Sequence, residues 1–308
     1  MPGKASRAAF GEAIVELGAR DPRIVTLDAD LSKSTMTTAF AKKFLDRAFN
    51  LGIAESNMIG VGAGLALTGQ VPFVCSFACF LIGRFETIRM SVASTNANVK
   101  LVGTHAGIAI GEDGYSQMGV EDVACMRALP NVEIIQPADE LETKHAVAYA
   151  VDHDGPVYLR LTRQNLEPVC PPDYRFQIGR WLVLRPGTEV TLIGSGGTVF
   201  NCVEAAKRLA AEGISAEVVN AASIKPLDEA MLLHSAGKTG HVVTVEDHSV
   251  AGGLGGAVAE LLSEVLPTPV RRLGVHGFGE SGDPAGLYRK HGLDPDGIAQ
   301  SVRKFLNR

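Results

Sequence analysis

The sequence predicts an α/β protein with two doubly wound, mostly parallel-sheet domains. Apolar runs of strand length alternate with segments of helical period, and this alternation occurs twice along the chain. The two series are separated by residues 166–188, a proline-containing stretch with little periodicity and the single tryptophan, Trp181. The 308 residues suffice for two domains of about 150 residues each. We therefore expect a first domain at 1–165, a linker at 166–188 and a second domain at 189–308.

The first series begins with a helix at 4–18, in which Phe10, Ala13, Ile14 and Leu17 recur at helical spacing. Apolar runs that predict strands follow at 24–27, 71–75, 100–104, 132–136 and 157–161. The segments between them predict helices at 54–68, 79–97, 120–128 and 139–151. Strands that alternate with helices predict right-handed crossovers and a mostly parallel sheet.

The second series repeats this arrangement after the linker. Strands are expected at 189–194, 215–220, 241–246 and 270–274. Helices are expected at 198–212, 228–236, 255–266, 284–291 and 295–307. The second domain is therefore expected to have its own parallel sheet and its own core.

Composition narrows the class of protein. Hydrophobic residues make up 46% and charged residues 20%, which is typical of a globular protein. The net charge of −5 argues against a general nucleic-acid surface, although it allows local basic sites. The chain has neither an apolar run of about 18 residues nor a signal-peptide core, so no membrane span is expected. Its five cysteines form no C-x-x-C pair, and we expect a reduced, cytoplasmic protein.

Two glycine-rich motifs resemble phosphate-binding loops without meeting the requirements. Gly60, Gly62 and Gly64 lie inside a predicted helix, where small residues favour close helix packing, including packing at a subunit interface. Gly194–Gly197 follows a strand and opens a helix, but Val199 stands where a dinucleotide fingerprint requires glycine. A tight structural turn is the favoured interpretation.

Four segments contain most of the candidate functional residues. They are GIAESNM (52–58), FACFLIGRFETIRM (77–90), THAGIAIGEDGYSQMGVED (104–122) and LTRQNL (161–166). Their order and spacing resemble those of the transketolase family. ASR (5–7) and DADLSKS (28–34) also resemble that family. The resemblance covers nearly the whole chain and implies the pyrimidine-binding domain and the C-terminal domain of a transketolase.

The resemblance implies that Glu55 activates thiamine diphosphate and that Phe77 and Phe80 bind its aminopyrimidine ring. From sequence alone, Glu55 equally suits a helix start, and the two phenylalanines suit a core. In the family, the glutamate shares a proton with a ring nitrogen, which an apolar pocket favours because burial raises a carboxyl pKa. Many transketolases carry tyrosine where this chain has Gly83.

The resemblance also assigns the sugar-binding residues. His105 is expected to act in catalysis and to contact the donor sugar, and it follows a strand at the edge where parallel sheets bind ligands. Asp113 is expected to accept a hydrogen bond from the acceptor sugar. Gln117 stands where many relatives carry histidine, so it keeps a contact but loses proton transfer. The sugar phosphate is expected to bind Arg7, Ser34 and Arg163, since guanidinium groups suit a phosphate.

The family also holds the diphosphate through a GDG motif and a downstream asparagine, which this sequence lacks. We expect no metal ligand here, and we expect a separate N-terminal transketolase subunit to supply the ligands of Mg²⁺ or Ca²⁺. Two such pairs would form a heterotetramer. The sequence itself leaves open whether the chain is a natural subunit or part of a longer protein.

Three alternatives remain at this stage. The β-subunit of a 2-oxoacid dehydrogenase decarboxylating component shares the size, the domain order and a GIAE-like segment. A 1-deoxyxylulose-5-phosphate synthase-like subunit shares the HAG sequence at 105–107. A non-catalytic partner subunit would keep the fold alone. The GEDG and TRQN segments favour transketolase, with reversible transfer of a two-carbon ketol unit from ketose phosphate to aldose phosphate.

Overall fold

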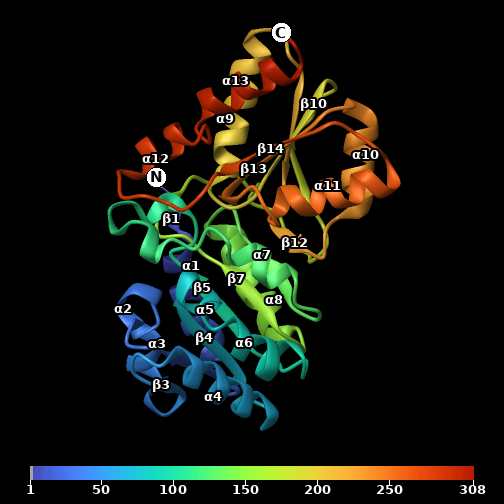
Figure 1. Cartoon of the computed structure of the whole chain (residues 1–308). Coiled ribbons are helices and arrows are strands. Elements are labelled where there is room, and N and C mark those ends of the chain that lie inside the picture. Colours follow the sequence, from blue (N-terminus) through green and yellow to red (C-terminus); the bar gives the residue numbers. More distant parts are fainter. Residues whose placement is uncertain (1–2) are drawn as a thin grey trace.

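The computed structural model describes residues 3–308, which form two α/β domains stacked end to end (Figure 1). The first domain contains a seven-stranded sheet in the order β12-β6-β7-β5-β4-β2-β3. The second contains a five-stranded sheet in the order β14-β13-β10-β11-β9. The predicted fold class is therefore confirmed, whereas the domain limits stay a prediction.

The centre of the first sheet is parallel and buried. Its strands are β2 (Ile24–Asp28), β4 (Val71–Phe77), β5 (Lys100–Thr104), β6 (Glu133–Ile135) and β7 (Val157–Arg160). One face is covered by α1 (Ser6–Gly18) and α8 (Glu140–Asp152), which pack side by side. Phe10 of α1 and Val147 of α8 belong to the core cluster on this face. The opposite face is covered by α4 (Glu55–Leu67) and α7 (Asp122–Arg127), whose Ile59 and Val123 belong to a second core cluster. Buried strands with both faces covered explain the near-continuous apolar runs in the sequence.

Several short elements of this domain were not predicted. They are β1 (Lys4–Ala5), α2 (Ser32–Thr35), α3 (Thr38–Lys43), a 3₁₀ turn at Leu45–Arg47, β3 (Ala48–Asn50), two 3₁₀ turns at Ile108–Asp113 and Tyr115–Gln117, and β8 (Asn165–Leu166). Elements of two to six residues are too short to show a hydrophobic period. The helix predicted at 79–97 is instead divided into α5 (Ala78–Ile82), α6 (Phe85–Thr87) and a π-helical segment (Ile88–Ala93). The break falls at Gly83 and at Arg84, which leaves helical geometry.

The second domain follows its prediction closely. Its parallel strands are β10 (Val190–Gly194), β11 (Ala216–Asn220), β13 (Val242–Ser249) and β14 (Val270–Val275). Its helices are α9 (Thr198–Ala211), α10 (Glu229–Thr239), α11 (Leu254–Val265), α12 (Pro284–Lys290) and α13 (Pro295–Phe305). Asp228, Asp283 and Asp294 cap the N-termini of α10, α12 and α13 by accepting backbone hydrogen bonds.

The two halves of the chain are interlocked at their boundary. β12 (Ser223–Lys225) comes from the second half of the sequence but pairs antiparallel with β6 of the first sheet. The stretch expected to be an irregular linker contains β9 (Leu182–Arg185), which pairs antiparallel with β11. Tyr174, in the same stretch, donates a hydrogen bond to buried Glu142 of α8, and Asn220 of β11 donates to the same carboxylate. These contacts hold the domains as one unit.

No helix within residues 3–308 combines the length and the apolar character that a membrane crossing requires.

The three glycines of α4 have different surroundings. A Cβ atom on Gly62 would lie 2.6 Å from Cγ2 of Val74 in β4, closer than real side chains approach. Gly60 and Gly64 are exposed, and a Cβ on either would meet no atom within 4 Å. Close packing of the helix on the sheet therefore explains Gly62 alone.

We predict opposite effects on stability for alanine at these positions. Gly62→Ala should lower the free energy of unfolding by about 1–3 kcal/mol, because the β-branched Val74 cannot move aside without strain. Gly60→Ala and Gly64→Ala should raise it by about 0.5–1 kcal/mol, the helix propensity gain of alanine over glycine. Urea unfolding of the three variants at one protein concentration measures this. Equal losses in all three would contradict the packing account.

Candidate functional site

A cavity of about 670 Å³ opens at the carboxyl ends of the parallel strands in the first domain. β2, β4, β5 and β7 each lead into a segment that contributes to its wall. This edge is where open parallel sheets bind ligands. The cavity is lined by Arg7, Leu31, Lys33, Ser34, Phe77, Phe80, His105, Asp113, Gln117 and Arg163.

Nine residues were predicted for the site, and the structure brings eight of them together around this cavity. Their numbers run from 7 to 163, so the fold and not the sequence makes them neighbours. Lys33 and Leu31 line the cavity as well, and the sequence analysis did not select them. Both lie in the DADLSKS segment, whose resemblance to the family was the available signal.

Arg7 is placed beside Arg163 by a small antiparallel ladder. β1 pairs with β8, with Lys4 opposite Leu166. Next to this ladder, the hydroxyl of Ser6 accepts a hydrogen bond of 2.8 Å from the backbone N–H of Thr162. Two short strands thus fix the start of α1 against the segment that follows β7.

Asp28, at the end of β2, organises the turn that carries Ser34. Its carboxylate accepts hydrogen bonds from the backbone N–H of Leu31 and, at 2.9 Å, from the hydroxyl of Thr35. The backbone carbonyl of Ser34 in turn accepts a 2.9 Å hydrogen bond from Nη1 of Arg7. Burial raises the pKa of Asp28 even though these donors favour its charged form.

His105 directly follows β5 and adopts a left-handed backbone conformation, with φ of 56°. Its Nε2 lies 3.1 Å from Nη1 of Arg7, which can only donate, so Nε2 is an acceptor. Its Nδ1 lies 2.9 Å from the hydroxyl of Thr104, which donates to the carbonyl of Ser76. The ring is therefore neutral with its proton on Nδ1.

The surroundings of His105 favour this neutral form. Burial is the largest cause, and the positive charges of Arg7 and Arg163 act in the same direction; together they lower the pKa of His105 from 6.5 to about 3. His105 is thus a hydrogen-bonding group at neutral pH and carries no charge there.

The charged residues of the cavity are mostly positive. Arg7, Lys33 and Arg163 line it together with a single carboxylate, Asp113. Oδ2 of Asp113 lies 3.0 Å from Nη1 of Arg163, and both side chains are partly exposed. Three cations against one anion suit a ligand with a negatively charged group.

Three rings form an aromatic wall. Phe77 and Phe80 are stacked with centroids 5.3 Å apart and planes inclined by 10°. Phe77 is also stacked on His105 at 3.8 Å. Phe77 is buried, whereas Phe80 is half-buried on the cavity, so Phe80 presents more aromatic surface to a ligand.

Glu55 is the predicted residue that does not line this cavity. It is the first residue of α4, and it is buried. The expected surroundings were apolar, but Nη2 of Arg84 lies 3.8 Å from Oε2 of Glu55. Arg84 directly follows Gly83, and α4 lies beside the helical segments that follow β4. An arginine from this break in the expected helix thus approaches the buried acid.

Residues 3–308 contain no cluster of three His, Cys, Asp or Glu side chains with the geometry to hold a metal ion.

The geometry of His105 predicts its titration. Nuclear magnetic resonance of the imidazole should show no protonation between pH 8 and pH 5, because its pKa lies near 3. Arg7→Gln should raise that pKa, since it removes a nearby positive charge, while burial keeps it below 6.5. A wild-type pKa close to 6.5, or no shift in Arg7→Gln, would contradict the assignment.

Comparison with known proteins connects this site to one family. Residues 3–168 match the model of the transketolase pyrimidine binding domain, and residues 179–298 match that of the transketolase C-terminal domain. A solved structure described as a split-gene transketolase in an inactive β4 tetramer is 48% identical, with a TM-score of 0.90 and 98% of each chain covered.

Two sequence relatives differ in length. The 6-deoxy-6-sulfo-D-fructose transketolase subunit SqwH of a Clostridium species is 40% identical, over 98% of this chain and 94% of its own. Human transketolase is 37% identical over 99% of this chain, which spans only 49% of the human protein. These matches agree with the resemblance seen in the sequence motifs. The chain belongs to the transketolase family, and it corresponds to the pyrimidine-binding and C-terminal domains of its members.

Proposed function

We propose that this chain is the C-terminal subunit of a two-subunit, thiamine diphosphate-dependent transketolase that transfers a two-carbon ketol unit between sugar phosphates. The supporting observation is the convergence of an aromatic wall, a neutral histidine and three cations at one edge of the first sheet. We place the reaction in the cytoplasm, as the cysteine pattern predicts.

The cofactor would lie with its pyrimidine end toward this chain. The Phe80 ring offers a stacking face, and Phe77 supports it from behind through the 5.3 Å stack. Glu55, a buried acid at the start of α4, would hold a proton against a pyrimidine nitrogen. When bound, thiamine diphosphate supplies the carbon nucleophile that accepts and passes on the ketol unit. The N-terminal subunit would hold the diphosphate and its metal ion, Mg²⁺ or Ca²⁺.

The sugar would lie along the cationic side of the cavity. Arg7 and Arg163 would bind the phosphate, assisted by Ser34 and by Lys33. Nε2 of His105 faces the same group of cations. It would orient the substrate without changing its own charge, by accepting a hydrogen bond from a sugar hydroxyl in place of the one that it accepts from Arg7. Asp113 would then bind a sugar hydroxyl, and Gln117 would add an uncharged contact.

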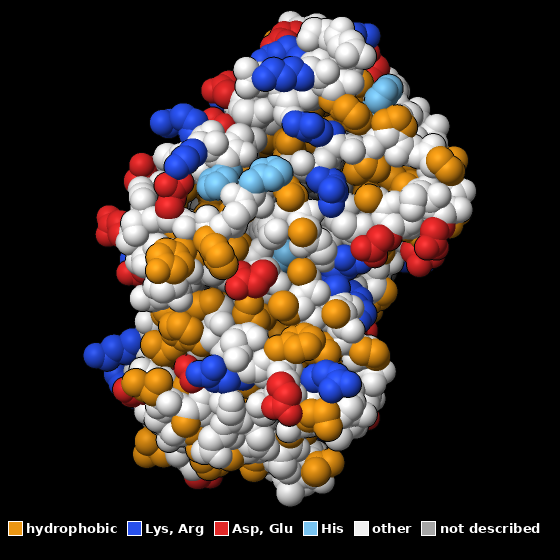
Figure 2. Space-filling view, in the orientation of Figure 1, with side chains coloured by type: hydrophobic (Ala, Val, Ile, Leu, Met, Phe, Trp, Pro, Cys, Tyr) orange, Lys and Arg blue, Asp and Glu red, His pale blue; other side chains and the backbone are white. Residues whose placement is uncertain are grey.

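A surface for a partner subunit is available on the first domain. Phe49, Ile53, Leu67 and Met90 are large apolar side chains that are exposed around α4, with Ile53 83% and Leu67 82% exposed. Figure 2 shows hydrophobic side chains on the surface of this lower domain. Exposed apolar groups of this size favour burial in an assembly. We propose that two pairs of subunits associate as a heterotetramer, and the inactive tetramer named for the 48% identical relative supports dependence on a second kind of chain.

Sulfonated sugars are a second candidate class of substrate. The name of the SqwH relative specifies a sulfonated sugar, and a sulfonate is an anion of similar shape to phosphate. The cationic cavity of this chain suits either group. Comparing phosphorylated with sulfonated ketoses in the reconstituted enzyme separates the two.

The enzyme reconstituted from this chain and the proposed N-terminal subunit tests the catalytic role of Glu55. We predict that Glu55→Gln lowers kcat by about 10²–10⁴-fold, the usual range for loss of acid–base catalysis, without abolishing binding of thiamine diphosphate. Calorimetry measures that binding separately. Glu264→Gln, a change in an exposed glutamate of α11 in the second domain, is the control and should leave kcat unchanged. Full activity of Glu55→Gln would remove the catalytic assignment.

A substitution of Arg163 tests whether this residue binds the phosphate group of the sugar. We predict that Arg163→Gln raises the KM for a phosphorylated ketose by about 10–100-fold, the loss of a charge-assisted hydrogen bond, and leaves the KM for an unphosphorylated ketose nearly unchanged. Arg175→Gln is the control, because Arg175 is an exposed arginine of the linker. An equal rise for both ketoses would show that Arg163 does not bind the phosphate.

A further inference from the structure

We propose that Asp247 and Tyr288, both from the second domain, are positioning residues for the substrate loop, defined as residues 105–119. This inference rests on the proposed function, because the loop carries His105, Asp113 and Gln117. It gives the second domain a specific task in sugar recognition.

The first domain fixes the two ends of this loop. The backbone carbonyl of Gly119 accepts hydrogen bonds from Nη2 of Arg160, at 3.0 Å, and from the N–H of Gly107, at 2.8 Å. The N–H of Ala106 donates to the carbonyl of Leu161. The loop is therefore closed at its base against β7, while the part between its ends has no strand to hold it.

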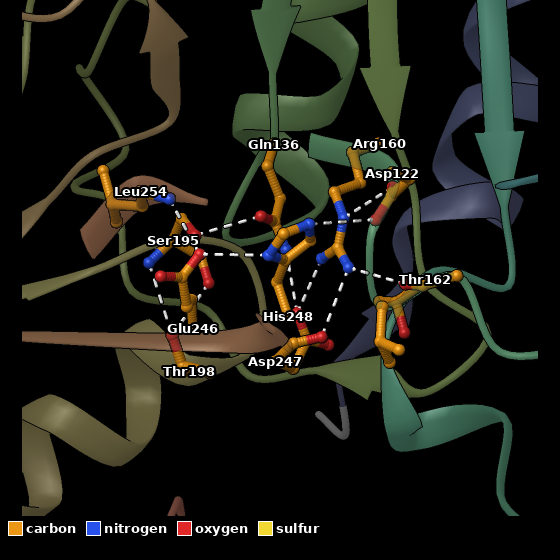
Figure 3. A network of polar contacts seen from close by, with 12 residues as sticks. Asp122, Gln136, Arg160, Thr162, Ser195, Thr198, Glu246, Asp247, His248 and Leu254 are labelled. Atoms are coloured by element: carbon orange, nitrogen blue, oxygen red, sulfur yellow. Dashed lines mark hydrogen bonds and ion pairs between the residues drawn. The ribbon is translucent and has the colours of Figure 1, made fainter. Parts of the chain in front are cut away.

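Asp247, in β13, presses on the start of the loop. Gly107 has φ of 77°, and a Cβ atom there would overlap the carboxylate of Asp247. Oδ1 of Asp247 accepts a 2.6 Å hydrogen bond from Nη1 of Arg160, so the carboxylate is held between the loop and the guanidinium. Figure 3 shows Arg160 reaching Asp122 on one side and Asp247 on the other.

Tyr288, in α12, connects the carboxylate of Asp247 to Gln164. Its hydroxyl donates to Oδ2 of Asp247 at 3.1 Å and accepts from Nε2 of Gln164 at 3.2 Å. Gln164 directly follows Arg163, which pairs with Asp113 of the loop. One buried hydroxyl thus links the beginning of the loop to the arginine that meets its middle.

The segment before α12 covers the middle of the loop. A Cβ atom on Gly114 would lie 2.5 Å from the hydroxyl of Ser281, which is too close. One on Gly111 would make a tight contact of 3.1 Å with Pro284. Both glycines have positive φ. The 3₁₀ turn that carries Asp113 is therefore shaped by close approach of the second domain.

The carboxyl edge of the sheet in the second domain packs against the first domain and is not open for a ligand. In a doubly wound sheet the crevice lies at the carboxyl ends of neighbouring strands such as β10 and β13. Here first-domain side chains fill that place: Gly196 lies against Gln136, and Gly197 lies against Gln164. Gln136 also bonds to Ser195 and Asp247. The crevice grips the first domain near the substrate loop.

Tyr288→Phe tests the proposal, with Tyr174→Phe as the matched control. Both variants remove a hydroxyl that donates to a carboxylate at the domain boundary, Asp247 or Glu142, but only Tyr288 is linked to the loop. In the isolated chain, amide hydrogen exchange of residues 107–118 should accelerate in Tyr288→Phe only. In the reconstituted enzyme, the KM for the sugar phosphate should rise on the order of ten-fold in Tyr288→Phe, with the affinity for thiamine diphosphate unchanged.

Asp247→Asn provides a second, stronger variant, since it weakens the bond to Arg160 while keeping the shape of the side chain. It should accelerate exchange in the loop and raise the KM further. If Tyr288→Phe and Tyr174→Phe lose thermal stability alike and neither changes exchange or KM, the residues are merely structural and the proposal is wrong. If no sugar is converted at all, the proposed function fails, while the exchange measurement still decides the positioning of the loop.

Discussion

The arrangement of both domains depends on one buried guanidinium, that of Arg160. The side chain is 1% exposed and donates to Asp122 of the first domain, to the carboxylate and carbonyl of Asp247 in the second, and to the carbonyl of Gly119. A buried cation is costly unless every donor finds an acceptor, and removal of one partner from such a pair costs about 3–5 kcal/mol. The carboxylates of Asp122 and Asp247 compensate the buried positive charge of Arg160. The pair with Asp247 thereby fixes the end of β7 against β13.

The electrostatics of the cavity follow from how the strands end. The chain carries a net charge of −5, yet the carboxyl edge of the first sheet gathers Arg7, Lys33 and Arg163 around one carboxylate. His105 stays neutral among them because it is buried and accepts from Arg7. A neutral ring at this place adds no charge repulsion toward Arg7 and Arg163, and its protonation state does not change near neutral pH.

Sequence reasoning succeeded where the signal was long or chemically distinctive. Buried strands such as Val71–Phe77 and helices such as Thr198–Ala211 were predicted from their apolar pattern. Eight of the nine residues that the family motifs predicted for the site line one cavity, and their roles in binding and catalysis stay predictions. The break of the helix at Gly83 was missed because apolar residues continue on both sides of it, and the approach of Arg84 to Glu55 depends on that break. Asp247 and Tyr288 were not selected, since a buried polar residue far along the chain gives no local pattern that names its partner.

The strand β12 has a consequence for how this chain can be divided. Although residues 223–225 belong to the second half of the sequence, they form the border of the first sheet beside β6. A fragment that stops in the linker would leave the hydrogen-bonding groups of β6 open to solvent and to other copies of itself, and open sheet edges promote aggregation. We therefore expect the first domain to need residues 223–225 in order to fold without aggregating.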